Sequence, residues 1–330
     1  MRSRTLSSAP FLRRCRIATR RFFTAPAAAT PLAMFRIGVA GVLLVQGLSL
    51  AGDVGELFGP QALVPAEVLD PQNGDSSIHP FSPRLRFLEG LLSPVGITAT
   101  ETARLTFLLY LAMLSCLLIG WQTRCVAAVA WLAHLALNNA ATATIYGVDM
   151  FAHISLFYCT VFPVGATFSI DAAGRRATPS AMNRLALRVL QLHLCVVYFS
   201  SAIEKAAGPQ WWNGEAIWRS VTLPELATFD MTWLAAVPWF AVLAGWGTLA
   251  VEAGYAVLIW PKRTRTAMAL ATIGMHVGIG ATMGLVSFSA LMVVLTAAAF
   301  LVTPEPRRPA AASVGRFRWP LFSTVKPRAT

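Results

Sequence analysis

Long apolar runs alternate with short polar turns along most of this chain. A helix needs about 20 apolar residues to cross the hydrocarbon layer of a bilayer, and runs near that length recur throughout the sequence. The pattern predicts an all-α fold, a polytopic transmembrane helix bundle of about eight spans. The predicted spans cover residues 32–51, 104–121, 124–142, 149–168, 185–204, 233–259, 266–283 and 285–302.

The segments between these runs are short, with one exception. Residues 52–103 are rich in proline and contain Asn73-Gly74, which favours turns over strands. Phe87-Leu88 and Leu91-Leu92 predict a short interfacial helix there, and the loop is expected to cap the outer mouth of the bundle. The last two spans should form a tight antiparallel pair, which the close-packing residues Gly278, Gly280 and Gly284 would allow.

Composition agrees with a membrane protein. The chain has 330 residues, of which 56% are hydrophobic and 13% charged, and a mean hydropathy of +0.59. Such a chain has too little polar surface for a soluble domain. A formal net charge of +12 would suggest nucleic acid in a soluble protein, but the basic residues gather in termini and short loops. The lipid bilayer is therefore the expected partner, and nucleic acid is not.

The charges between the spans predict the orientation. The first 30 residues contain seven arginines and no acid, whereas most of the charged residues in the loop 52–103 are acidic. The positive-inside rule therefore puts a basic tail (1–30) inside, followed by the transmembrane domain (31–303) and a basic, proline-rich tail (304–330), also inside. Lys205 then lies at the outer face of a multi-pass plasma-membrane protein. The other basic residues expected inside are Arg124, Arg175, Arg176, Arg184, Lys262, Arg263, Arg265, Arg307 and Arg308.

Neither the cysteines nor the histidines follow a metal-binding pattern. The five cysteines include no CxxC pair, and the five histidines include no HExxH motif. We therefore expect no metal site and reduced cysteines. His134 and His193 are interpreted as interhelical hydrogen-bond partners.

Lys205 ends an apolar run and is the most informative residue of the chain. It shares one helical stripe with Tyr198 and Ser201, at spacings i, i+3 and i+7, and such a stripe faces protein or a water-filled pocket. A partly desolvated ammonium at a membrane boundary can give up its proton and act as a base. Alternatively, Lys205 snorkels to the headgroups, with Trp211 and Trp212 as an interface belt. The residues alone leave both interpretations open.

Four other ionisable residues lie in or beside the spans. Arg36 is near an inner end, where snorkelling explains it, and Asp149 is predicted to cap a helix N-terminus. Glu252 and His276 lie inside spans and either line a cavity or hydrogen-bond neighbouring helices. A buried glutamate must be neutral or paired.

Several short motifs occur together between residues 20 and 305. The most specific is Tyr198-Phe199-x(5)-Lys205-x(5)-Trp211-x-x-Gly214. With the other motifs it resembles the horizontally transferred transmembrane domain (HTTM) family, which includes the vitamin K-dependent gamma-carboxylases and shorter bacterial relatives similar to toxin-peptide maturation proteins. The accompanying motifs are Phe35-Arg36-Ile37-Gly38, Gly120-Trp121-Gln122-Thr123-Arg124, Asn138-Asn139, Tyr146-Gly147-x-Asp149, and His276 followed by Phe288-Ser289.

The resemblance implies a chemistry and a set of site residues. It implies that Lys205 is the base associated with oxygenation of a reduced quinone similar to vitamin K hydroquinone, and that His276 is a second catalytic residue. The substrate would be an exported peptide. Ala140 stands where the carboxylases carry a histidine. The residues expected to support the site are Tyr198, Ser201, Glu252, Arg36, Asp149, Trp211 and Trp212.

Three functions from different classes remain open. The first is a quinol-dependent enzyme that modifies an exported peptide, and the second is a non-catalytic membrane factor that binds a secreted peptide and assists its maturation. The third is a carrier of a small lipid or ion. The carrier is least favoured, because the sequence shows no inverted repeat and no paired broken helices.

Overall fold

A computed structural model describes residues 9–59, 83–141, 144–226 and 228–302. Within these ranges the chain forms helices and short turns, with one isolated β-bridge between Ala27 and Ser180. The basic tail predicted over residues 304–330 lies outside the described residues, as does much of the loop predicted over 52–103.

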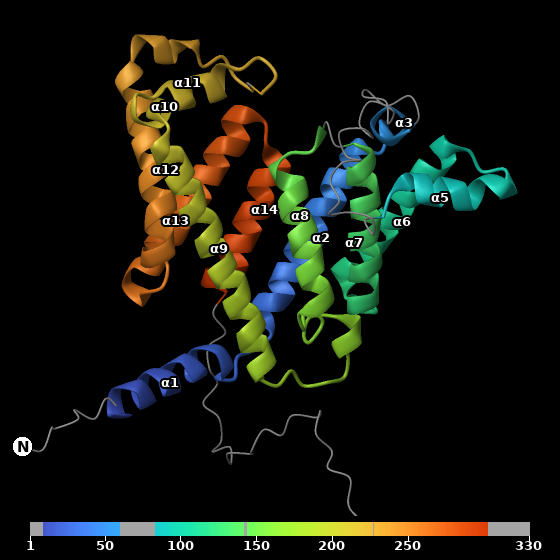
Figure 1. Cartoon of the computed structure of the whole chain (residues 1–330), viewed down its shortest axis with the longest axis horizontal. Helices are drawn as coiled ribbons and strands as arrows, with labels where there is room; N and C mark the ends of the chain where they lie inside the picture. Colours follow the sequence, from blue (N-terminus) through green and yellow to red (C-terminus); the bar gives the residue numbers. More distant parts are fainter. Residues whose placement is uncertain (1–8, 60–82, 142–143, 227, 303–330) are drawn as a thin grey trace, which may run out of the picture.

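Each predicted apolar run overlaps a helix, although the run 149–168 is helical only to Val161. These helices lie side by side, and the chain passes to and fro between the two ends of a bundle (Figure 1). Five of them, α2, α6, α9, α12 and α13, are long and apolar enough to cross a membrane. The fold therefore fits a multi-pass membrane protein, and the remaining three spans stay a prediction. The bundle helices are α2 (Thr30–Leu50), α6 (Ala99–Ile119), α7 (Thr123–Ala140), α8 (Gly147–Val161), α9 (Ala181–Ala207), α12 (Pro238–Leu258), α13 (Lys262–Met283) and α14 (Val286–Thr296), which continues as the π-helix η5 (Ala297–Leu301).

Local sequence sets the ends of these helices. Thr98 and Glu101 form a capping box that starts α6, and Gly120, with a φ of 74°, ends it in the left-handed conformation that glycine favours. Asp149 accepts a hydrogen bond from the Tyr146 N–H at 3.0 Å and so caps α8, as the sequence predicted.

The last two long helices pack closely, as expected, although only two of the three predicted glycines take part. A Cβ on Gly280 would lie 3.1 Å from the Ser289 side chain of α14. Gly284 forms the turn with a φ of 67°. Gly278 instead faces open space, where a Cβ would meet no atom within 4 Å.

One end of the bundle carries most of the basic residues, and we call it the basic end. The first residues, predicted as a tail, contain helix α1 (Ala9–Thr24), which runs across this end instead of along the bundle axis (Figure 1). Arg184 of α9 donates to the Ala25 carbonyl at 2.9 Å, so α1 is fixed to α9 at its C-terminal side. The basic end is formed by Arg20, Arg21, Arg124, Arg175, Arg176, Arg184, Lys262, Arg263 and Arg265.

Short helices cover the opposite end. The predicted interfacial helix is present as α5 (Leu85–Leu92), and α3 (Val54–Phe58) lies nearby, both against α6. A second covering segment packs over α12, on the other side of the bundle (Figure 1). It comprises α10 (Pro209–Trp212), α11 (Glu215–Thr222) and η4 (Thr232–Ala236).

Candidate functional site

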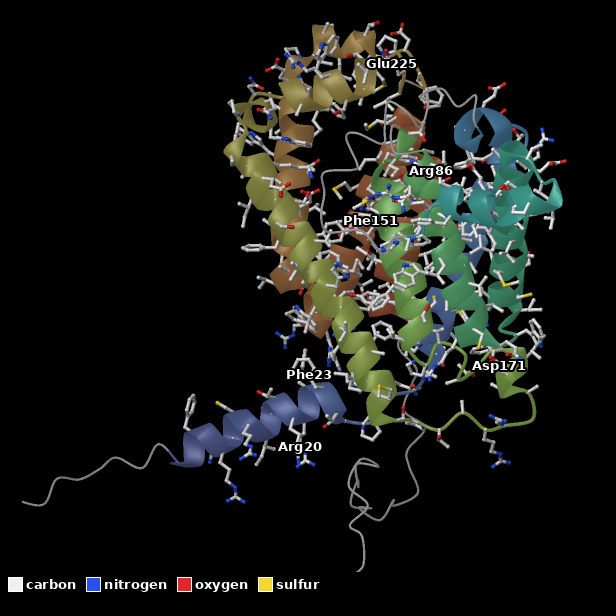
Figure 2. All side chains as sticks on the ribbon, turned by 45° about the vertical axis from the view of Figure 1, so that its right-hand side comes forward. Arg20, Phe23, Arg86, Phe151, Asp171 and Glu225 are labelled. Carbon is white, nitrogen blue, oxygen red and sulfur yellow. The ribbon has the colours of Figure 1, made fainter. Side chains whose placement is uncertain are left out.

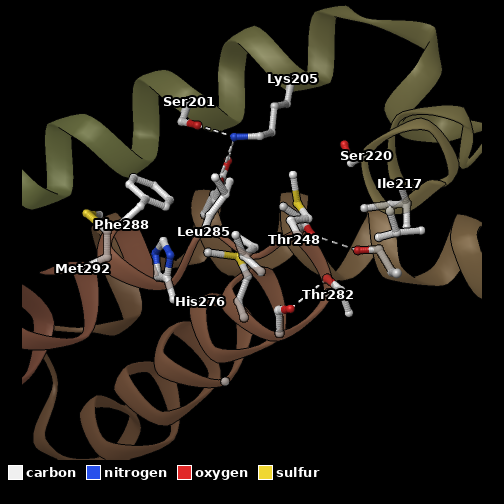
Figure 3. Close-up of a pocket in the computed structure, with 18 of the residues that line it drawn as sticks. Ser201, Lys205, Ile217, Ser220, Thr248, His276, Thr282, Leu285, Phe288 and Met292 are labelled. Atoms are coloured by element: carbon white, nitrogen blue, oxygen red, sulfur yellow. Dashed lines mark hydrogen bonds and ion pairs between the residues drawn. The ribbon is translucent and has the colours of Figure 1, made fainter. Parts of the chain in front are cut away.

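A cavity of about 550 Å³ lies between this covering segment and the bundle (Figure 3). Its walls come from α9, α12, α13 and α14, with Phe151 of α8 and residues of α11 and η4 completing them. Most of the lining is apolar, which is typical of a site for a small apolar molecule. The polar lining residues are Tyr198, Ser201, Lys205, Ser220, Thr248, Glu252, His276 and Thr282.

Lys205 is held by protein groups at the wall of this cavity. Its Nζ donates to Glu252 Oε1 at 2.8 Å and to Oε2 at 3.0 Å, and it also donates to the Ser201 hydroxyl. The Glu252 side chain is only 8% exposed and that of Lys205 24%. An ion pair this deeply placed carries no net charge, which lowers the cost of keeping either group in the bundle. Lys205 therefore does not snorkel to the headgroups.

A second polar pair borders the same cavity. The Tyr198 hydroxyl and His276 Nε2 are 2.8 Å apart, and both residues are buried. His276 Nδ1 is buried without a hydrogen-bond partner among the described residues. A buried polar atom of this kind is costly unless a water or a ligand satisfies it. The predicted stripe of Tyr198, Ser201 and Lys205 thus meets His276 and Glu252 at one place (Figure 3).

Some site residues were missed by the sequence prediction. Ala244, Thr248 and Glu252 follow one another at spacings of four on α12 and all line the cavity. That periodicity is visible in the sequence and would have added Thr248 to the candidate set. Met231 and Leu234 carry no such signal, because they reach the cavity only through the fold of the covering segment.

Trp211 and Trp212, both predicted to support the site, lie in different environments. Trp211 lines the cavity, and the Lys205 Nζ lies 5.2 Å from the centre of its ring. This distance allows a cation–π contact. Trp212 does not line the cavity; its indole N–H donates to the Ala206 carbonyl at 2.8 Å on a half-exposed surface.

The prediction that Arg36 snorkels was wrong. Its side chain is fully buried, its Nη1 donates to the Leu117 carbonyl at 3.1 Å, and its Nη2 donates to the Phe168 carbonyl. One carbonyl near the end of α6 and one in the loop after α8 take the place of the headgroups. Neither Arg36 nor Asp149 lines the cavity, so both support the fold at a distance from it.

His134 and His193 link helices, as expected. His134 Nε2 is 3.0 Å from the Asn138 amide and 3.2 Å from the Asp149 carbonyl, and His193 Nδ1 is 2.9 Å from the Tyr158 hydroxyl. Among the described residues, no group of three or more His, Cys, Asp or Glu could hold a metal ion, and the cysteines are unpaired.

The chain is similar to uncharacterized protein YitO of Bacillus subtilis (strain 168). The two are 24% identical over 194 residues, which is 55% of this chain and 62% of that protein, so less than two thirds of YitO is covered. At this identity and coverage the relative transfers no activity to the chain. No family model matches the chain, and no solved structure matches it.

Proposed function

We propose that this membrane protein is an enzyme that binds a reduced lipid quinone in the cavity and takes a proton from it with the Lys205–Glu252 pair. The observation that carries the proposal is the position of this pair at the wall of a largely apolar cavity. Apolar walls suit a ring with a hydrocarbon tail, and a few fixed polar groups suit the hydroxyls of the ring.

The pair handles the proton as one unit. A reduced quinone, when bound, would supply two hydroxyl protons and two electrons, and dioxygen would be the co-reactant that accepts the electrons, as the HTTM resemblance implies. Glu252 accepts one proton at a carboxylate oxygen. The Lys205 ammonium keeps its charge and balances the negative charge that is left on the ligand oxygen. Alternatively, Lys205 first passes a proton to Glu252 across their 2.8 Å contact and then takes the ligand proton itself. Both routes break one ligand O–H bond and leave the same protons on the pair.

Tyr198 and His276 provide a second anchor for such a ligand. Their 2.8 Å hydrogen bond fixes the imidazole, and the unpartnered Nδ1 can bind one more polar group or water. A molecule with two separated hydroxyls could therefore be held by the two polar pairs of the cavity.

An exported peptide as the final substrate rests on the HTTM resemblance. Residues of α11 and η4 line the cavity, and α11 lies at the end of the bundle opposite the basic end (Figure 1). If the positive-inside prediction holds, this end faces outward, where an exported peptide would be available.

Cavity filling tests ligand binding. Gly278 lines the cavity and has open space around its Cβ position, so Gly278→Leu should fill the cavity without a clash. Gly247→Leu is the matched control, since Gly247 also has open space but does not line the cavity. Mass spectrometry of protein extracted from native membranes should find an isoprenoid quinone with the wild type and with Gly247→Leu but not with Gly278→Leu. Equal retention by both variants, or no quinone with the wild type, would overturn the proposal.

Proton transfer is tested separately with Lys205→Arg. Arginine keeps the positive charge beside Glu252 but does not give up a proton in proteins. If Lys205 itself takes the ligand proton, oxygen uptake with added reduced quinone should fall to the background although the quinone still binds; if Glu252 takes the proton directly, Lys205→Arg should keep oxygen uptake. A fully active Lys205→Arg protein would remove Lys205 from the proton path.

A secreted peptide that co-purifies with unchanged mass, without quinone, would instead support the non-catalytic maturation factor.

A further inference from the structure

Helix α1 has two chemically opposite faces. Arg13, Arg16 and Arg20 follow one another at spacings i, i+3 and i+7, so they form a single basic stripe. At spacings i, i+4, i+7 and i+11 the opposite face carries Phe11, Cys15, Ala18 and Phe22. A helix of this kind, with arginine on one face and aromatic residues on the other, is typical of segments that lie in a membrane interface.

The position of α1 fits that orientation. Its C-terminal part is attached to the bundle, where the Phe22 ring lies 5.6 Å from the Trp260 ring and 3.9 Å from the Arg188 guanidinium. Its N-terminal part projects beyond the bundle, and Phe11 is 70% exposed (Figure 1). Figure 2 shows Arg20 on the side of the helix away from the bundle. Because Phe22, a member of the apolar face, contacts Trp260 of the bundle, the apolar face is turned toward the level of the bilayer.

The arginines of α1 and the protein surface beside them are basic, which favours an anionic partner. The first 30 residues contain no acid, and no ion pair involves the arginines of α1 among the described residues. Arg184 and Arg265 lie close enough to Arg188 for their charges to repel it, so the neighbouring protein surface is basic too. Within the described residues, therefore, no carboxylate forms an ion pair with the arginines of α1.

We propose that α1 is an in-plane anchor that inserts its apolar face into the bilayer and binds the phosphate groups of anionic phospholipids with Arg13, Arg16 and Arg20. Each arginine near an anionic surface favours binding by about fivefold, and three together by about a hundredfold. A soluble acidic protein would satisfy the arginines but would leave the opposite, exposed apolar face without a partner. The bilayer satisfies both faces.

The full-length protein provides its own probe position at Cys15. Replacing Cys116 and Cys125 with serine leaves Cys15 as the accessible thiol, because Cys159 and Cys195 are buried. An environment-sensitive fluorophore on Cys15 is followed after reconstitution into vesicles of phosphatidylcholine alone or of phosphatidylcholine with phosphatidylglycerol. Phospholipids brominated in their acyl chains quench the fluorophore when the apolar face is inserted.

Strong quenching is expected in the phosphatidylglycerol vesicles and much weaker quenching in phosphatidylcholine alone. The triple variant Arg13→Gln, Arg16→Gln, Arg20→Gln should lose this difference, with an insertion equilibrium about a hundredfold less favourable. The control variant Arg175→Gln, Arg176→Gln removes charge from the same end of the bundle and should retain the difference. High salt should weaken it, and inorganic phosphate at matched ionic strength should have no additional effect.

Two results would overturn the proposal. Equal quenching in both kinds of vesicle would show that insertion does not depend on anionic headgroups. A fluorophore that stays open to aqueous iodide in both vesicles would show that α1 does not insert and that its arginines serve a soluble partner or none. Neither result depends on whether the cavity binds a quinone.

Discussion

Lys205 and Glu252 are 47 residues apart in the chain, yet the Lys205 Nζ lies 2.8 and 3.0 Å from the two carboxylate oxygens of Glu252. The pair joins α9 to α12 beside the cavity. Because the Lys205 ammonium and the Glu252 carboxylate compensate each other's charge, the two residues depend on each other for their burial.

This dependence predicts strong coupling between the two positions. Lys205→Met or Glu252→Leu alone should lower the free energy of unfolding by roughly 2–4 kcal/mol, because either change leaves an uncompensated charge in the bundle. The double variant should be more stable than either single variant. Denaturant unfolding in detergent, arranged as a double-mutant cycle, measures the coupling. Additive losses would show that the contact contributes nothing to the fold.

The helical architecture was predictable because apolar length is a strong signal. All eight predicted runs overlap helices, and the periodicity of Tyr198, Ser201 and Lys205 correctly places them on one face. The partner of that face was not predictable, because a stripe shows which side of a helix is polar and not which helix it meets. Glu252 therefore remained one of two alternatives until the packing of α9 against α12 was known.

Arg36 and α1 show two other limits of the sequence. Snorkelling describes an arginine near a membrane boundary, but the carbonyls of Leu117 in α6 and of Phe168 after α8 provide acceptors within the protein that no local pattern reveals. The arginines of α1 raised its charge enough to suggest a tail, although their helical spacing already separates them from the phenylalanines. In both cases the geometry of the arginines, and not their charge, decides where they lie.

Gly120 should be the glycine least tolerant of substitution at the basic end. Its φ of 74° strains any other residue, and a Cβ there would lie 1.8 Å from Arg36 Nη1 and 2.3 Å from Ser169 Cβ. Gly120→Ala should therefore displace the Arg36 guanidinium and lower the unfolding midpoint markedly. The readout is thermal unfolding in detergent.

Gly174→Ala is its matched control. Gly174 has a φ of 73° but no atom within 4 Å of its Cβ position, so only the strain of the left-handed conformation applies, about 1–2 kcal/mol. The difference between the two variants isolates the contact with Arg36. Equal losses would show that the guanidinium moves away without cost.

Tyr198→Phe should destabilise the bundle and weaken ligand retention together. Removing the hydroxyl leaves His276 Nε2 without its 2.8 Å partner, in addition to the unpartnered Nδ1, at a cost of roughly 1–3 kcal/mol. Tyr158→Phe breaks the comparable 2.9 Å contact with His193, but Tyr158 is only half-buried and away from the cavity. It should cost less and leave co-purified quinone unchanged. A loss of quinone with both variants would argue against a local effect.

Asp171 should give the protein an acid-sensitive contact at the basic end. Partial burial acts to raise the pKa of its carboxyl group, but hydrogen bonds from the Thr123 hydroxyl and from the Thr123 and Gln122 N–H groups, together with the Arg36 charge, lower this pKa below its ordinary value of 3.8. The carboxylate thus contributes stability that is complete well above pH 3.8 and is lost as the pH falls through the lowered pKa.

Unfolding midpoints measured from neutral pH down to the acid limit should show this loss for the wild type. Asp171→Asn keeps one oxygen acceptor but no ionisable group, so its midpoint should be lower at neutral pH and less dependent on pH below 3.8. The two proteins should therefore converge in stability as the pH falls. Parallel curves of unfolding midpoint against pH for wild type and Asp171→Asn would show that other carboxyl groups cause the loss of stability in acid. The contact between Asp171 and the start of α7 would then add no pH dependence.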